Sequence, residues 1–225
     1  MISRLRLFLK ALFMFVIGTA CISAMVFIPA GTFSYPGGIL FSAALLVPIF
    51  IMMFILAIFA PDLLEKRLSK HETEKRQKLV VGLSALMFIC GFVIAGLDYR
   101  FGWTQLPIWV MTGAAVIMLL SYIMLAEVMR ENAYLSRTVE VQENQKVVDS
   151  GLYGIVRHPM YSGTVVMFLM MPLVLGSFAA FVIFLAYPIL IAIRIQNEEK
   201  VLCEGLEGYN EYRSRVRYRL IPFIW

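Results

Sequence analysis

Long apolar runs, separated by short polar stretches, dominate the first half of the chain. They cover residues 11–28, 39–60, 79–97 and 108–126. A helix needs about 20 apolar residues to cross the hydrocarbon core of a bilayer. The pattern therefore predicts four transmembrane helices. We expect the first to be retained, because no small-residue cleavage site followed by a soluble domain comes after it.

Residues 162–193 form a longer stretch without a charged side chain, and basic residues stand on both sides of it. One straight helix over this stretch would measure roughly 45–50 Å, against a hydrocarbon core of about 30 Å. Pro172, Gly176 and Ser177 favour a turn in its middle. We therefore predict a helical hairpin, with arms short for complete crossings, that returns both flanks to one face of the membrane.

The distribution of Lys and Arg indicates which face that is. The basic segments alternate with weakly charged loops: basic residues gather before residue 11 and in 61–78, 127–161 and 194–219, whereas 31–38 and 98–105 carry only Arg100. Basic loops stay in the cytoplasm. Both termini and the hairpin mouth are therefore predicted to be cytoplasmic. The short chain without a retrieval signal favours a prokaryotic plasma membrane.

Composition agrees with an all-α polytopic membrane protein of about six helical segments. Hydrophobic residues make up 60% of the chain and charged residues 16%, which is more apolar than soluble domains of this length. The net charge of +5 follows from the cytoplasmic loops, so it does not indicate nucleic acid. We divide the chain into a four-span scaffold, residues 1–126, and a cofactor-binding half, residues 127–225.

Cysteine and histidine residues are too few and too scattered for a metal centre or a disulfide framework. The chain has Cys21, Cys90 and Cys203, with no Cys-x-x-Cys pair, and only His71 and His158. We predict no metal ligands.

Polar residues with recognisable spacing lie on either side of the predicted hairpin. The first strip holds Gly151-Leu152-Tyr153 and Arg157-His158-Pro159-Met160-Tyr161-Ser162-Gly163, and the second holds Arg194, Glu198-Glu199, Tyr209, Tyr212 and Pro222. Taken together, these elements resemble the isoprenylcysteine carboxyl methyltransferase family and its phospholipid-methylating relatives. The resemblance covers roughly residue 127 to the C-terminus, and the first four spans match only as generic apolar helices.

The resemblance implies S-adenosylmethionine as methyl donor, held in a cytoplasmic pocket, and a lipid-borne acceptor that enters sideways from the bilayer. It implies that Arg194 orients the acceptor. The implied cofactor contacts are Gln142, Val147, Val148, Tyr153, His158, Pro159, Met160, Tyr161 and Glu198. Alignment needs a gap between Gln142 and Val147, and Leu206-Glu207-Gly208 replaces the family's usual Phe-Gly.

Elementary chemistry supports these roles. The Glu198 carboxylate can accept hydrogen bonds from a ribose or an amino group, and His158 can donate to the donor's carboxylate. The faces of Tyr153 and Tyr161 suit a sulfonium cation or an adenine ring. Arg194 stands four residues before Glu198, so the two share a helix face. It can hold an ionised acceptor carboxylate in bidentate fashion, without a general base.

Simpler interpretations stay open for the same residues. His158 can cap a membrane span, and Arg194 with Glu198 can form an ordinary surface ion pair. Tyr153 and Tyr161 can anchor the chain at the lipid headgroups. The tail arginines are interpreted as anchors for anionic lipid; they are Arg213, Arg215, Arg217 and Arg219.

The favoured function is O-methylation of an isoprenylcysteine-type carboxylate. The alternatives are N-methylation of a phospholipid headgroup, a sterol-reductase-like enzyme with a nicotinamide cofactor, and a small non-enzymatic transporter component. The expected partners are the bilayer and a lipid or prenylated acceptor, not nucleic acid. The acceptor's identity and the oligomeric state are left open.

Overall fold

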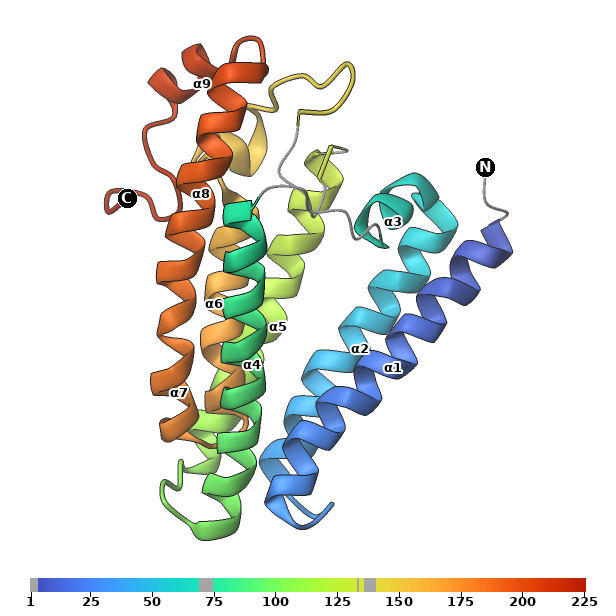
Figure 1. Ribbon diagram of the computed structural model, residues 1–225, viewed down its shortest axis with the longest axis vertical. Helices are drawn as coiled ribbons and strands as arrows, with labels where there is room; N and C mark the ends of the chain where they lie inside the picture. The colour runs from blue at the N-terminus through green and yellow to red at the C-terminus, as the bar shows by residue number, and fades with distance from the viewer. Residues whose placement is uncertain (1–3, 69–74, 133, 136–140) are drawn as a thin grey trace.

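The computed structural model describes residues 4–68, 75–132, 134–135 and 141–225, so His71 lies outside the described residues. The described part is all-α, as predicted, and contains no strand. Its elements in chain order are α1 (Arg4–Ala30), α2 (Pro36–Phe59), α3 (Pro61–Leu68), α4 (Lys75–Phe101), α5 (Ile108–Glu131), the 3₁₀ turn η1 (Gly151–Gly154), α6 (Pro159–Val174), α7 (Phe178–Phe184), α8 (Ala186–Gly205) and α9 (Tyr209–Arg215) (Figure 1).

The four predicted spans are confirmed as the helices α1, α2, α4 and α5, each longer than its apolar run. Within the described residues five helices are long and apolar enough to cross a membrane, the fifth being α7 with α8 over Phe178–Gly205. Helix α6 is apolar but has 16 residues. Counting α7 and α8 as one arm, these are the six hydrophobic segments that the sequence predicts.

The predicted hairpin is confirmed, with a correction to its arms and its turn. The chain reverses at Leu175–Ser177, where Gly176 adopts a left-handed φ of +78° that glycine tolerates best. Pro172 lies inside α6 and does not form the turn. The first arm is short, but the second is not. Its helix continues beyond Ile193, because the polar residues that follow go on forming helical hydrogen bonds outside the apolar layer.

A buried carboxylate holds the turn of the hairpin at the end of the bundle remote from the hairpin mouth. Asp98, 1% exposed, accepts a hydrogen bond from the backbone N–H of Thr104 at 2.6 Å and from the hydroxyls of Thr104 and Ser177. The Tyr35 hydroxyl donates to the carbonyl oxygen of Leu175. A buried ion requires such partners. We call this group the Asp98 clamp; it ties α2 and α4 to the turn.

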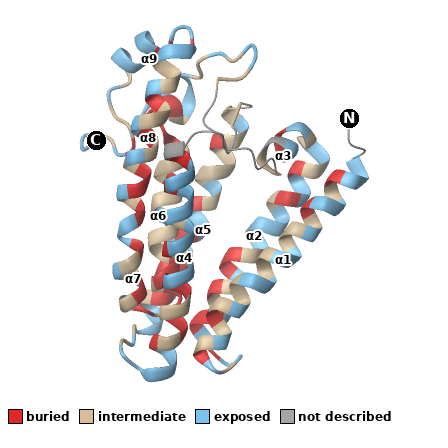
Figure 2. Cartoon of the chain, viewed as in Figure 1, coloured by how far each residue is buried: buried red, intermediate tan, exposed pale blue. Residues whose placement is uncertain are grey.

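Two packing regions organise the helices. The main core lies among α2, α4, α5 and the hairpin, and a smaller cluster joins α1, α2 and α3. Helices α5 and α6 run side by side, and a Cβ at Gly163 would come within 3.1 Å of the Leu125 side chain, so only glycine allows this approach. Large exposed apolar side chains, such as Phe13 and Ile51, cover the outer faces, as expected for lipid contact (Figure 2).

The division at residue 126 stays a prediction. Helix α5 runs through this position and packs against α6 on the other side of it.

The Asp98 clamp predicts a loss of stability on Asp98→Asn. The amide nitrogen would face donors from Thr104 and Ser177, and leaving one buried donor without an acceptor costs about 1–3 kcal/mol. A lower melting temperature in detergent is the expected result, with Asp62→Asn, at an exposed position on α3, as the control. Equal melting temperatures for the two variants would contradict the clamp.

Candidate functional site

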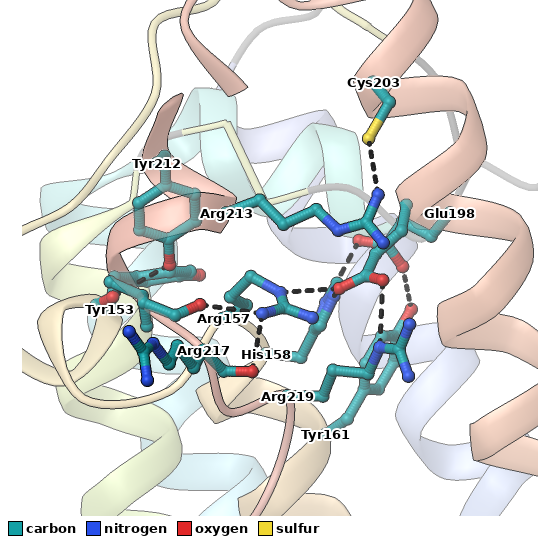
Figure 3. A network of polar contacts seen from close by, with 12 residues as sticks. Tyr153, Arg157, His158, Tyr161, Glu198, Cys203, Tyr212, Arg213, Arg217 and Arg219 are labelled. Atoms are coloured by element: carbon teal, nitrogen blue, oxygen red, sulfur yellow. Dashed lines mark hydrogen bonds and ion pairs between the residues drawn. The ribbon is translucent and has the colours of Figure 1, made fainter. Parts of the chain in front are cut away.

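A buried ion pair joins the two polar strips at the hairpin mouth. The Arg157 Nε donates to Oε1 of Glu199 at 2.7 Å, and the two side chains are 5% and 4% exposed. Arg157 Nη1 also donates to the carbonyl oxygens of Val216 and Arg217, at 2.7 and 2.8 Å (Figure 3). One guanidinium therefore connects the segment before α6, the helix α8 and the C-terminal tail.

The tail is further bound through its backbone and through Arg219. The backbone N–H groups of Arg157 and His158 donate to the carbonyls of Tyr218 and Arg219, both at 2.9 Å. Arg219 Nε donates to the second oxygen of Glu199, also at 2.9 Å. These contacts correct the interpretation of the tail arginines as lipid anchors, because Arg219 completes the buried network. A second tail arginine, Arg215, is paired within the protein as well.

The side chains aimed at the donor in our prediction form a connected row. The Tyr161 hydroxyl donates to Oε2 of Glu198 at 2.6 Å and accepts from Nε of Arg194 at 2.8 Å. His158 places Nδ1 3.9 Å from Glu198 and Nε2 3.4 Å from Glu199. Arg194 and Glu198 thus share a helix face as predicted, and the Tyr161 hydroxyl links them.

Helix α4 supplies a partner that the sequence did not indicate. Gln77 is fully buried, and its side-chain oxygen accepts from Nη1 of Arg194 at 3.1 Å. Its amide nitrogen lies 3.4 Å from the Arg194 carbonyl oxygen. The orientation of Arg194 therefore depends on the four-span scaffold as well as on the hairpin.

The turn η1 positions Tyr153 over the same cluster. Gly151 has a φ of +55°, and a Cβ there would lie 1.5 Å from Oε1 of Glu131, so only glycine fits. Glu131 accepts from the backbone N–H of Leu152 at 3.0 Å, which fastens η1 to the end of α5. The Asn132 amide donates to the Tyr153 hydroxyl at 2.9 Å. Burial raises the pKa of Tyr153 to about 12, so the phenol stays protonated at neutral pH.

These residues line one cavity of about 110 Å³, which we call the polar cavity. Eight of the ten predicted site residues are among its lining: Val147, Val148, Tyr153, His158, Met160, Tyr161, Arg194 and Glu198.

The other two predicted site residues are not among the described lining, which corrects their assignment as cofactor contacts. The Gln142 amide donates to the Tyr134 carbonyl oxygen and so shapes the loop before η1. Pro159 is the first residue of α6, where its ring favours the helical φ and its missing N–H costs nothing. Each supports a neighbour that does line the cavity.

The structure adds lining residues to which we had given no role. They are Asn132, Tyr134, Leu135, Gln145, Lys146, Arg157, Leu202, Leu206, Tyr209 and Tyr212. Tyr209 and Tyr212 stood in the second strip, so a signal for them was present. For Asn132, which ends α5, no local pattern marked the position. Glu199 was passed over because two adjacent glutamates look alike in sequence, although only Glu198 lines the polar cavity.

Residues 113–204 match the model of the Isoprenylcysteine carboxyl methyltransferase (ICMT) family. The resemblance to this family is confirmed. The matched segment begins in α5 and ends in α8, so it contains the row from His158 to Glu198. The family supports methyltransferase activity in a membrane protein. The first three long helices and the C-terminal tail lie outside the match.

The depth of the Arg157–Glu199 pair predicts a large effect of Arg157→Gln. Removing one partner of a buried pair leaves an uncompensated charge and costs about 3–5 kcal/mol. The control is Arg215→Gln: Arg215 also binds a carboxylate, Asp149, at 2.7 Å, but the side chains are 65% and 44% exposed. Exposed pairs contribute less than about 1 kcal/mol. Urea or thermal unfolding should separate the two variants, and similar losses would show that burial is not decisive.

Proposed function

We propose that this protein is an integral membrane methyltransferase that uses S-adenosylmethionine and methylates the carboxylate of an isoprenylcysteine-type, lipid-borne acceptor. The observation that supports it is the row of Arg194, Tyr161, Glu198 and His158 along one cavity at the hairpin mouth. This row lies in the segment that resembles the methyltransferase family. The basic loops favour the cytoplasmic face for the cavity.

The chemistry of the polar cavity suits the methyl donor, which supplies an electrophilic methyl group on a sulfonium. Glu198 offers carboxylate oxygens to a ribose hydroxyl or an ammonium group. His158 can donate a proton to a carboxylate, and the buried rings of Tyr153 and Tyr209 offer faces to a cation or an adenine ring. Val147, with its apolar neighbours, lines the same cavity.

Binding has to widen this cavity. Its volume of about 110 Å³ is below the roughly 300–1,000 Å³ of most small-molecule sites. Part of its lining, from Gln145 to Val148, belongs to a segment without helix, where fewer backbone hydrogen bonds oppose a shift. The helical side of the cavity, with Arg194 and Glu198, is the fixed one.

Arg194 has the role of holding the acceptor. An acceptor carboxylate is ionised at neutral pH, and a guanidinium can bind it through two parallel hydrogen bonds. Tyr161 and Gln77 orient Arg194 before the acceptor arrives. Methyl transfer is an in-line displacement, so placing the two reactants together supplies much of the acceleration. An amine acceptor would instead have to lose a proton.

Donor binding tests the first half of the proposal. Calorimetry on the purified protein should detect S-adenosylmethionine and its demethylated product, and Glu198→Gln should weaken both by about tenfold or more, since a charged hydrogen-bond acceptor is lost. Glu204→Gln, exposed on the same helix, is the control. No binding of either compound to the unchanged protein would overturn the proposal.

Turnover tests the second half. With a radiolabelled methyl donor and an N-acylated S-prenylcysteine as acceptor, Arg194→Lys should lower the turnover by at least about tenfold and leave the donor affinity unchanged, because lysine cannot make the bidentate contact. Transfer of label to a phospholipid amine, and not to the prenylcysteine, would reassign the acceptor to the N-methylation alternative.

A further inference from the structure

A second cavity adjoins the polar cavity on the side of the four-span scaffold. It has a volume of about 350 Å³ and lies among α1, α2, α3 and α5, with Met160 from the start of α6. Figure 1 shows the α1–α2 pair diverging from the other long helices towards the end where α3 lies. Met160 lines both cavities, so one side chain separates them. We call this second space the methionine cavity.

The lining of the methionine cavity suits a flexible hydrocarbon chain. Its volume falls in the range of small-molecule sites. Apart from Arg67 and Tyr122, the described lining is apolar, and its methionines are Met14, Met52, Met53, Met129 and Met160. Methionine side chains are unbranched and adjust to the shape of their partner. Such a wall accepts chains of differing conformation better than a rigid pocket of branched residues does.

One cation stands where the two cavities meet. Arg67, on α3, is the single charged side chain among the described lining residues, and it is half-buried. Its Nη2 lies 3.6 Å from the sulfur of Met160. The Arg67 charge also reaches the polar cavity: burial raises the pKa of Tyr153, and the positive charge of Arg67 acts in the opposite direction. A thioether is a weak acceptor, so an anionic group can take its place beside the guanidinium.

We infer that the methionine cavity holds the hydrocarbon chain of the methyl acceptor and that Arg67 binds the acceptor's anionic group where it passes into the polar cavity. This inference rests on the proposed function, and it assigns the recognition of the acceptor to the four-span scaffold, which lies outside the matched segment. The chain would lie between α1, α2 and α5. Its head would meet Arg67 first and Arg194, inside the polar cavity, second.

Photo-crosslinking tests the position of the chain without requiring turnover. The probe is an S-prenylcysteine analogue with a diazirine in its hydrocarbon chain, added to the full chain in lipid nanodiscs. Label should appear on Phe15, Met53 and Leu125 and should decrease with unlabelled competitor. Label confined to exposed, lipid-facing residues such as Phe13 and Ile51 would overturn the inference.

Arg67→Gln tests the anion contact. We expect about a tenfold weaker affinity for the carboxylate probe and an unchanged affinity for its neutral amide, because only the charged head loses a partner. Arg67→Lys should restore part of the affinity. Arg130→Gln is the matched control, since Arg130 lies on α5 with its side chain 73% exposed and pairs with Glu127.

Further arms separate the remaining outcomes. An alkyl phosphate probe that loses affinity in Arg67→Gln while the carboxylate probe does not would mean that Arg67 binds a lipid headgroup, which overturns the acceptor assignment. Equal losses for the carboxylate and its amide would overturn the anion contact. The S-adenosylmethionine affinity serves as a folding readout; its absence in the unchanged protein would refute the proposed function, while crosslinking would still report on the methionine cavity.

Filling the methionine cavity gives an independent test. Met53→Trp should shift the preference towards shorter acceptor chains by reducing the space beside α2. Ile51→Trp, two residues away on the lipid-facing side, should leave the preference unchanged. The same preference in both variants, with donor affinity intact, would contradict a chain-binding role for this cavity.

Discussion

The buried pair between Arg157 and Glu199 is the interaction on which the candidate site depends. The two residues are far apart in the sequence, and each adjoins a residue of the polar cavity: Arg157 precedes His158, and Glu199 follows Glu198. A helix presents adjacent residues about 100° apart. Glu199 can therefore hold the assembly together while Glu198 faces the cavity. The structural and the chemical carboxylate are distinct, and the Arg219 guanidinium serves the structural one.

Much of the fold could be predicted from the sequence because the bilayer imposes simple rules. Apolar length predicted the spans, and the uncharged stretch between two basic flanks predicted the fold-back at Leu175–Ser177. Helix ends were less accessible, since α8 continues well beyond the last apolar residue, Ile193. Nothing in the apolar pattern shows where a helix stops once it leaves the membrane.

The candidate site shows the same division between residue type and three-dimensional placement. Motif resemblance located His158, Tyr161, Arg194 and Glu198, whose side chains meet. It could not show that the Gln142 amide turns to a backbone carbonyl, because the loop that holds it has no repeating pattern. Nor could it reveal Gln77, whose contact with Arg194 spans 117 positions in the chain. Contacts of this kind appear only when helices are packed.

The length of α6 has a consequence for where the chemistry takes place. Sixteen residues rise about 24 Å, against a hydrocarbon core of about 30 Å. When the turn held by the Asp98 clamp is level with one boundary of the core, His158 at the other end of α6 sits about 6 Å below the opposite boundary. Headgroups and water must then dip towards the imidazole, as they do where a bilayer thins around a short span. A lipid's reactive head can reach that depth while its tail stays among neighbouring lipids, so the enzyme need not extract its acceptor from the membrane.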